Sequence, residues 1–277
     1  MKKHAIKAFT LVEMMVAIAI TCILIVAIAA FISAVLSNWT TGRDQLRKNM
    51  DARAALDLIV QDLDNVVISP SPLRPAQEWI CKDVDPAIGG GAYTATNVAK
   101  LMFFSTPLDQ TPNLSGNVCG VAYCLGYEDP ILTNSSNSIK LFGLYRTRIS
   151  PSDTFVNLIG ATNLETSYWT NVNMLASTNF LIPHVIDFRI ICHVRNPDNS
   201  LADVPYDSLV TLGDGLQVSP SQSNILAGAY LESMDVSIKL ITEDIASDIR
   251  HSPANANELI SLKSQTYMRH IALSYLH

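Results

Sequence analysis

The sequence predicts an α+β fold in which one long N-terminal helix packs on an antiparallel β-sheet. Three observations support this prediction. An apolar run over residues 14–36 is followed by helical spacing of apolar residues up to Val67, and the first prolines, Pro70 and Pro72, come after it. Several later segments alternate apolar and polar residues. Such alternation is typical of antiparallel strands with one buried face and one solvated face.

The helix begins with a segment long enough to cross a bilayer. Residues 14–36 form an apolar run interrupted only by Thr21 and Ser33, and about 20 such residues span the hydrocarbon core. A secretory signal peptide has a shorter apolar core, of about 7–15 residues. A plain membrane anchor fits the length, and the basic leader predicts a cytoplasmic N-terminus. It leaves Glu13 unexplained, because a carboxylate in hydrocarbon costs at least ~2.5–3.5 kcal/mol unless it is paired.

The N-terminus resembles that of the type IV pilin-like superfamily, which includes type IV pilins and the pseudopilins of type II secretion. The matching parts are the leader, residues 1–8, and the motif Phe-Thr-Leu-Val-Glu at residues 9–13 with its apolar continuation. The resemblance implies that a membrane-embedded prepilin peptidase cuts between Ala8 and Phe9 and methylates the new N-terminus at Phe9. Ala8 occupies a position where the family usually has glycine.

The same resemblance makes Glu13 the fifth residue of the mature chain. Cleavage would create an α-amino group at Phe9, four residues before Glu13. An amine of the same or of a neighbouring subunit would then cancel the charge of Glu13. We expect Glu13 to select a neighbouring subunit and to set its axial register. The alternative is a carboxylate that only reaches up to the membrane interface.

Residues 37–68 are expected to continue the helix in amphipathic form. One helix from residue 9 to residue 67 would be about 85 Å long, with Gly42 as a plausible bend. The predicted divisions of the chain are a removed leader (1–8), a membrane and filament-core helix (9–36), the amphipathic continuation (37–68) and an extracytoplasmic domain (69–277). The apolar positions expected to pack on the sheet are Leu46, Met50, Leu56, Ile59, Leu63 and Val67. Charged residues assigned to the solvent face include Lys48, Asp62 and Asp64.

The extracytoplasmic domain is predicted to begin with a loop over residues 69–98, where Gly89, Gly90 and Gly91 form a turn or linker. Residues 150–182 and 196–228 are expected to be long connections containing short elements. The predicted strands cover residues 100–105, 118–127, 139–149, 184–195, 234–243 and 265–276. This order resembles the pilin fold. The chain size and residues 53–63 and 266–270 look most like J-type minor pseudopilins or PilW-like minor pilins.

Four cysteines lie beyond the apolar run. Cys81, Cys119, Cys124 and Cys192 could form two disulfides in one of three pairings, or they could be buried free thiols. Their spacing places Cys119 and Cys124 on opposite sides of a strand, and the alternation places Cys192 toward the core.

We expect no cofactor and no metal site, with calcium as the open alternative. His184 and His193 are expected to be surface or packing residues.

Composition and motifs favour a structural subunit over an enzyme. The net charge of −6 becomes −9 when the three lysines of residues 1–8 are removed, and no basic stripe indicates nucleic-acid binding. No catalytic or nucleotide-binding motif is evident. The resemblance implies a minor pseudopilin that starts in the bacterial inner membrane with a periplasmic domain and enters a filament, where its size favours the tip. Its partners would be prepilin peptidase, other pilins or pseudopilins and the inner-membrane assembly platform.

Two alternatives to this function remain open. The chain could be a minor subunit of a type IV pilus. It could also be a membrane-anchored periplasmic binding domain that never polymerises.

Overall fold

The computed structural model describes residues 10–67, 77–82, 88–90, 93–95, 97–106, 117–131, 139–159, 174–205, 208–213, 215–219, 221–251 and 255–273. The chain divides into two compact units, Met1–Arg47 and Lys48–His277. We call the second of these the globular unit.

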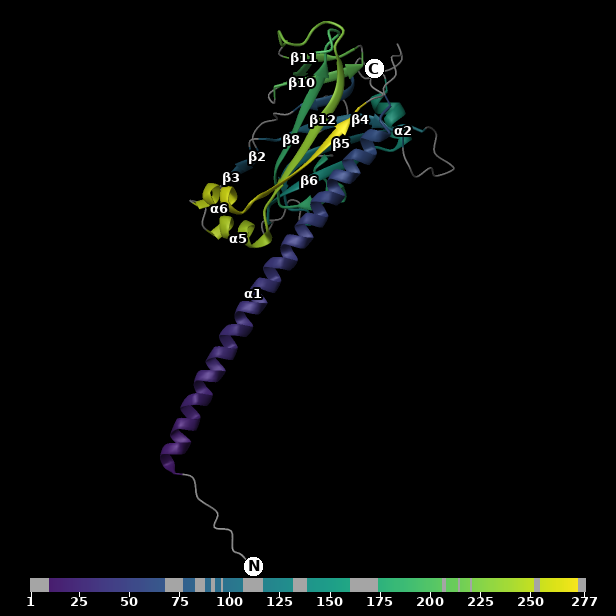
Figure 1. Cartoon of the computed structure of the whole chain (residues 1–277). Helices are drawn as coiled ribbons and strands as arrows, with labels where there is room; N and C mark the ends of the chain where they lie inside the picture. The colour runs from purple at the N-terminus through teal and green to yellow at the C-terminus, as the bar shows by residue number, and fades with distance from the viewer. Residues whose placement is uncertain are drawn as a thin grey trace, which may run out of the picture. The chain divides into compact units, whose positions relative to one another are not determined.

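The long N-terminal helix is confirmed as α1, Leu11–Asp64 (Figure 1). Its 54 residues correspond to about 80 Å, and the helix continues through Gly42. It ends three residues before the predicted position because the chain turns into the sheet. The side-chain amide of Asn65 donates to the carbonyl of Gln61 at 2.7 Å. Two residues later, the backbone N–H of Val67 donates to the carbonyl of Phe104 at 2.8 Å.

The strands of the globular unit form three antiparallel sheets. In the seven-stranded sheet the order is β11-β10-β1-β4-β5-β6-β7, in the four-stranded sheet it is β13-β12-β8-β9, and β2 pairs with β3. The strands of the seven-stranded sheet are β1 (Gln77–Lys82), β4 (Lys100–Ser105), β5 (Cys119–Glu128), β6 (Leu141–Arg148), β7 (Phe180–Pro183), β10 (Leu209–Gly213) and β11 (Gln217–Ser219). Those of the four-stranded sheet are β8 (Val185–Arg195), β9 (Leu201–Asp203), β12 (Tyr230–Leu240) and β13 (Gln265–Ala272). The small sheet contains β2 (Ile88–Gly90) and β3 (Tyr93–Ala95).

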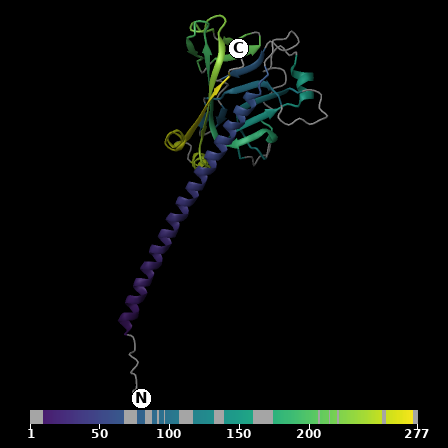
Figure 2. The same cartoon turned by 45° about the vertical axis from the view of Figure 1, so that its right-hand side comes forward.

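Short helices lie between the strands. α2 (Pro151–Asp153) and the π-helix η1 (Thr154–Leu158) follow β6, and the 3₁₀ helix η2 (Ser177–Asn179) precedes β7. α5 (Glu243–His251) and α6 (Ala256–Lys263) separate β12 from β13. Figure 2 shows the two larger sheets from a second direction.

Most predicted strands are confirmed, and the loop predicted at the start of the extracytoplasmic domain is partly wrong. β4 has the predicted bounds, while β12 begins four residues earlier and ends three residues earlier than predicted. Within residues 69–98 the structure instead has β1, β2 and β3. β1 lies inside the seven-stranded sheet because it pairs with β4 on one side and β10 on the other. Gly89 and Gly90 belong to β2 and not to a turn.

One apolar core joins the last turns of α1 to both large sheets. Ile59 and Leu63 of α1 are fully buried, and they share this core with Phe103 of β4 and Phe188 of β8. Packing of this kind is the main stabilising contribution to the fold. The core therefore fixes the end of α1 in the globular unit.

The predicted apolar stripe of α1 is correct only in its second half. Leu46 and Met50 are 65% and 71% exposed. Ala52 and Ala55 are buried instead, since their small side chains let the helix backbone lie close to the sheets. The burial of α1 thus depends on small residues as well as on the large apolar residues that were predicted.

Candidate functional site

The first turn of α1 is closed by a reciprocal pair of hydrogen bonds between Thr10 and Glu13. The backbone N–H of Thr10 donates to Glu13 Oε2 at 2.9 Å, and the backbone N–H of Glu13 donates to Thr10 Oγ1 at 3.3 Å. The Thr10 hydroxyl also donates to Glu13 Oε2 at 3.0 Å. This is a capping box, which satisfies N–H groups that a helix end otherwise leaves without partners.

The capping box fixes the direction of the Glu13 carboxylate. The carboxylate points back toward the residues that precede the helix, and the helix dipole favours a negative charge at this end. Ala8 and Phe9, the residues of the predicted cut, lie outside the described residues. The Thr-x-x-Glu spacing is a sequence signature of such a cap, and it is the signal by which Thr10 could have been predicted as the partner of Glu13.

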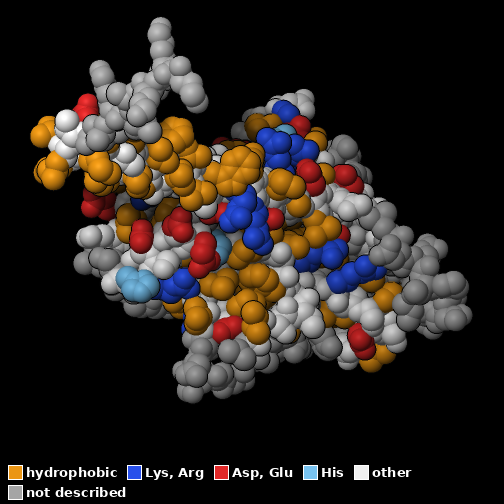
Figure 3. Space-filling model, turned by 90° about the horizontal axis from the view of Figure 1, so that it is seen from below, with side chains coloured by type: hydrophobic (Ala, Val, Ile, Leu, Met, Phe, Trp, Pro, Cys, Tyr) orange, Lys and Arg blue, Asp and Glu red, His pale blue; other side chains and the backbone are white. Residues whose placement is uncertain are grey.

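The surface of α1 over residues 14–36 is almost entirely apolar on all sides. Among the described residues, α1 is the one helix long and apolar enough to cross a bilayer. The space-filling view shows hydrophobic side chains gathered along the N-terminal helix (Figure 3). Two hydroxyls interrupt this surface, and both are satisfied internally: Thr21 donates to the Ala17 carbonyl at 2.8 Å and Ser33 to the Ala29 carbonyl at 2.9 Å. Such internal bonds are what hydrocarbon requires of polar groups.

At the other end of α1, Asp62 is buried and paired, which corrects its assignment to the solvent face. It is 7% exposed. Arg146 of β6 donates from Nε to Asp62 Oδ2 at 2.7 Å and from a terminal nitrogen to Asp62 Oδ1 at 2.8 Å. The Tyr123 hydroxyl of β5 also donates to Asp62. Burial and the neighbouring Asp62 charge raise the pKa of Tyr123, so its hydroxyl remains a donor.

We call Asp62, Tyr123 and Arg146 the Asp62 cluster. A two-point contact between a guanidinium and a carboxylate has a defined geometry as well as a charge attraction. The cluster therefore sets the position of α1 along the sheet more closely than apolar packing alone would.

Lys48 was also assigned to the solvent face, and it too is buried. Burial lowers the pKa of its ammonium group.

The C-terminal strand also holds α1. The Tyr267 hydroxyl of β13 donates to the side-chain oxygen of Asn49, and Arg269 lies 3.4 Å from the Asp57 carboxylate. Asn49 and Tyr267 are 218 residues apart in the chain. The last strand thus fastens the helix from the four-stranded sheet, while the Asp62 cluster fastens it from the seven-stranded sheet.

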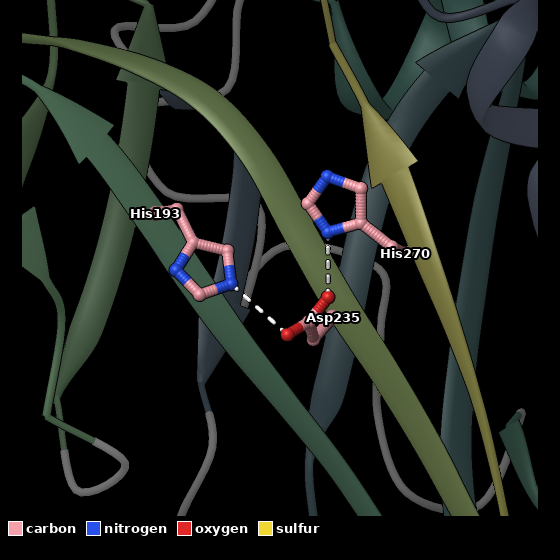
Figure 4. Close-up of side chains that lie close together, drawn as sticks. All are labelled: His193, Asp235 and His270. Carbon is pink, nitrogen blue, oxygen red and sulfur yellow. Dashed lines mark hydrogen bonds and ion pairs between the residues drawn. The ribbon is translucent and has the colours of Figure 1, made fainter. Parts of the chain in front are cut away.

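A row of alternating imidazoles and carboxylates crosses the four-stranded sheet. The row consists of His270 on β13, Asp235 on β12, His193 on β8 and Asp203 on β9, and we call it the histidine row. His270 Nδ1 lies 2.7 Å from Asp235 Oδ1, His193 Nε2 lies 3.1 Å from Asp235 Oδ2, and His193 Nδ1 lies 2.6 Å from Asp203 Oδ1. Figure 4 shows Asp235 between the two rings, with one carboxylate oxygen toward each.

The register of the strands explains the histidine row. Asp235 is directly opposite His270, and His193 is directly opposite Asp203. His193 is opposite Ser233, so it meets Asp235 on the diagonal, which long side chains can reach. Burial opposes protonation of His193, but its hydrogen bonds to Asp203 and Asp235 raise its pKa overall. The expectation of an ordinary surface or packing histidine is therefore too simple for His193.

The cysteines do not pair as disulfides where the structure describes them. Cys119 and Cys192 are buried free thiols. Cys124 is buried against Met102 and Phe104, on the other face of β5 from Tyr123, so the predicted opposite orientation of Cys119 and Cys124 fits the burial pattern. Cys192 faces the core as predicted. The side chain of Cys81 lies outside the described residues.

Comparison with known proteins adds one finding, and it concerns the N-terminus. Residues 3–36 match the family model described as "Prokaryotic N-terminal methylation motif". The chain carries a prepilin-type leader. The match implies a pilin-like or pseudopilin-like subunit that is processed by prepilin peptidase and assembled as pilins are. No curated protein and no solved structure matches the chain.

The leader and the fold agree with one another. The motif covers the residues before and within the apolar half of α1. The rest of the structure is a long helix packing on antiparallel sheets, which is a pilin-like α+β fold. An apolar helix with this motif is consistent with anchoring in the inner membrane.

Proposed function

We propose that this chain is a minor pseudopilin of a type II secretion system, a structural subunit without catalytic activity. The observation that carries the proposal is the coincidence of the methylation motif at residues 3–36 with the apolar first half of a continuous helix that begins at Leu11. An anchor alone requires only the helix. The methylation motif implies in addition that prepilin peptidase removes the leader. This cleavage leaves the apolar helix attached to the mature chain, where it is available for assembly.

A position at the filament tip is part of the proposal. The globular unit comprises Lys48–His277, which is large for a subunit that must repeat in a tight helical array. A bulky subunit is better accommodated where it need not repeat. Its work there would be to start or cap the filament together with smaller pilin-like subunits.

Glu13 is proposed as the residue that recruits a neighbouring subunit. Hydrolysis between Ala8 and Phe9 leaves a carboxylate on the leader and an α-amino group on Phe9. The capping box already directs the Glu13 carboxylate toward that part of the chain. Before a neighbour arrives, the hydrogen bonds from Thr10 make the carboxylate less costly at the membrane surface. An α-amino group from the next subunit can then replace the water bound to the remaining lone pairs of the Glu13 carboxylate.

Mass spectrometry of the mature protein tests the processing step. We expect N-methylated Phe9 as the first residue when the protein is isolated from cells that contain prepilin peptidase. Cells without the peptidase should keep Met1 and the leader. A functional protein that retains the leader in the presence of the peptidase would contradict the proposal.

Variants at Glu13 test the assembly step. Glu13→Ala and the uncharged Glu13→Gln should both insert and be processed but fail to co-purify with other pilin-like subunits after cross-linking. Glu258→Ala, which removes an exposed glutamate of α6, is the matched control and should co-purify normally. If Glu13→Gln assembles as well as the control, charge pairing at Glu13 is not the basis of assembly.

The identity of the co-purified subunits decides between two systems. Pseudopilins and loss of protein secretion in a deletion strain would support the proposal. Pilus subunits and loss of surface pili would assign the chain to a type IV pilus. Recovery of the processed chain without any other subunit would indicate an anchored domain that does not polymerise.

A further inference from the structure

The histidine row contains three possible metal-ligand atoms that lie close together on the four-stranded sheet. His193, Asp235 and His270 each offer one ligand atom, and these atoms lie within 4.8 Å of one another. The two imidazole rings are 6.0 Å apart between centroids, with Asp235 between them (Figure 4). Three adjacent strands supply the three residues, so the backbone of the sheet fixes their spacing.

The spacing is close to that of a tetrahedral zinc site. Zinc binds imidazole nitrogen and carboxylate oxygen at about 2.0–2.2 Å, which places neighbouring ligand atoms about 3.4 Å apart. The present ligand atoms are separated by at most 4.8 Å, which is about 1.4 Å more than that spacing. The side chain of His270 is 62% exposed and that of His193 is 15% exposed. The exposed ring of His270 can therefore adjust, while the more buried ring of His193 stays in place.

Asp203 supplies a second and independent observation. It is not one of the three ligands; it binds Nδ1 of His193 at 2.6 Å, on the side of the ring away from Asp235. Metal-bound histidines commonly make this outer contact with a carboxylate, which fixes the tautomer and directs the other nitrogen at the metal. In this structure that other nitrogen, Nε2, already faces Asp235.

We propose that Nε2 of His193, Nδ1 of His270 and a carboxylate oxygen of Asp235 form a zinc-binding site, with Asp203 as a positioning residue and solvent as the fourth ligand. Zinc fits better than calcium or magnesium because two of the three ligands are imidazoles, whereas the harder cations take oxygen ligands. On binding, the metal takes the place of the protons shared between each ring and Asp235. Those protons pass to solvent, and no redox change is involved.

The site would secure the C-terminal strand. Its ligands come from β8, β12 and β13, and β13 also carries Tyr267, which holds α1 through Asn49. β13 is an edge strand with a single neighbour, β12, in the described sheet. A bound metal would add a link from β13 to β8 across that neighbour. The globular unit would then be more stable with zinc than without it, by mass action.

The experiment uses full-length protein in detergent, purified without a histidine tag and stripped of metal with a chelator. Zinc binding is measured by isothermal titration calorimetry and by thermal unfolding with and without zinc. The variants are His270→Gln, Asp203→Asn and, as a control, His251→Gln, which changes an exposed histidine of α5 outside the row. Circular dichroism checks that each variant is folded.

The wild type should bind one zinc ion per chain and unfold at a higher temperature when zinc is present. His270→Gln should lose both effects, His251→Gln should keep both, and Asp203→Asn should bind about 10–100-fold more weakly. Absence of zinc binding by the wild type would overturn the proposal, as would equal affinity in the wild type and His270→Gln. Should His270→Gln prove unfolded, Asp235→Asn replaces it, with the same loss expected. Unchanged affinity in Asp203→Asn would overturn the role given to Asp203.

Discussion

Arg146 binds both carboxylate oxygens of Asp62, at 2.7 and 2.8 Å, across 84 residues of sequence. Asp62 lies in the last turn of α1, and Arg146 lies in the seven-stranded sheet. The helix that carries part of the methylation motif is therefore held to the globular unit by a specific ion pair as well as by apolar packing.

Removing Asp62 should destabilise the globular unit strongly. In Asp62→Ala the buried guanidinium and the Tyr123 hydroxyl lose their shared partner, and breaking a buried pair costs about 3–5 kcal/mol. Because the Arg146 side chain keeps 22% exposure, we expect the lower end, about 3 kcal/mol. Urea unfolding followed by fluorescence measures the loss.

Asp64→Ala is the matched control for that measurement, since Asp64 is an exposed carboxylate of the same helix turn. It should change the unfolding free energy by less than about 0.5 kcal/mol. A triple variant that makes the whole Asp62 cluster apolar, with Asp62→Leu, Tyr123→Phe and Arg146→Met, should restore much of the stability, because a buried ion pair is often no better than apolar packing. Equal losses in Asp62→Ala and Asp64→Ala would show that the pair is not important for stability.

Tyr267→Phe should loosen the C-terminal strand without unfolding the protein. It removes one hydrogen bond, to Asn49, and such a bond contributes about 0.5–1.5 kcal/mol. Amide hydrogen exchange should accelerate in β13 and in the part of α1 near Asn49. Met268→Ala changes a neighbouring residue that is 62% exposed, and its exchange pattern should match the wild type.

Asp187 should make part of the stability depend on pH. Burial raises its pKa, although Asn97 donates to it at 2.6 Å and Lys239 lies 3.8 Å away. The folded state then binds a proton more tightly than the unfolded state does. This contribution is therefore present at low pH and is lost as pH rises from the ordinary aspartate value of about 3.9 through the raised pKa.

Asp187→Asn removes the titrating group at nearly constant shape. Relative to the wild type, its urea midpoint should therefore improve as pH increases across that window. Asp244→Asn, at an exposed position of α5, should follow the wild type at every pH. A difference between Asp187→Asn and the wild type that does not vary with pH would contradict the prediction.

Thr10→Ala should fray the first turn of α1. It removes the side chain that accepts from the Glu13 N–H at 3.3 Å, and loss of such a cap costs about 0.5–2 kcal/mol. Thr10→Ser keeps the hydroxyl and should behave as the wild type. NMR of the mature protein in micelles would report the fraying as faster amide exchange and lost helical shifts at residues 11–13.

The sequence predicted the elements whose patterns are local. The helix of residues 9–67 followed from apolar spacing, and β8 and β12 followed from alternation over many residues. β2 and β3 were missed because they are short, and all three strands of this region, β1 included, lie among prolines and glycines. The strand conformation of β1 depends on its neighbours β4 and β10, which no local pattern identifies.

The candidate sites were predictable to different degrees. Glu13 was conspicuous because a carboxylate at the start of an apolar run demands a partner. Asp62 looked like a solvent-facing charge, although its spacing from Ile59 places it on the buried side, and its partner Arg146 lies far away in sequence. The histidine row depends on the register of four strands. Strand register depends on tertiary contacts and not on local sequence patterns. The proximity of His193, Asp235 and His270 could therefore not be predicted from the sequence.

The position of β13 has a consequence for synthesis. The strand that holds Asn49 is made of residues 265–272, so synthesis must reach these residues before this contact can form. Contacts that span so much of a chain form late and slow folding. A protein cut short by a premature stop or a protease would keep its N-terminal apolar helix but lack the contact between Tyr267 and Asn49. Formation of β13 thus distinguishes chains that make this contact from shorter fragments before either enters a polymer.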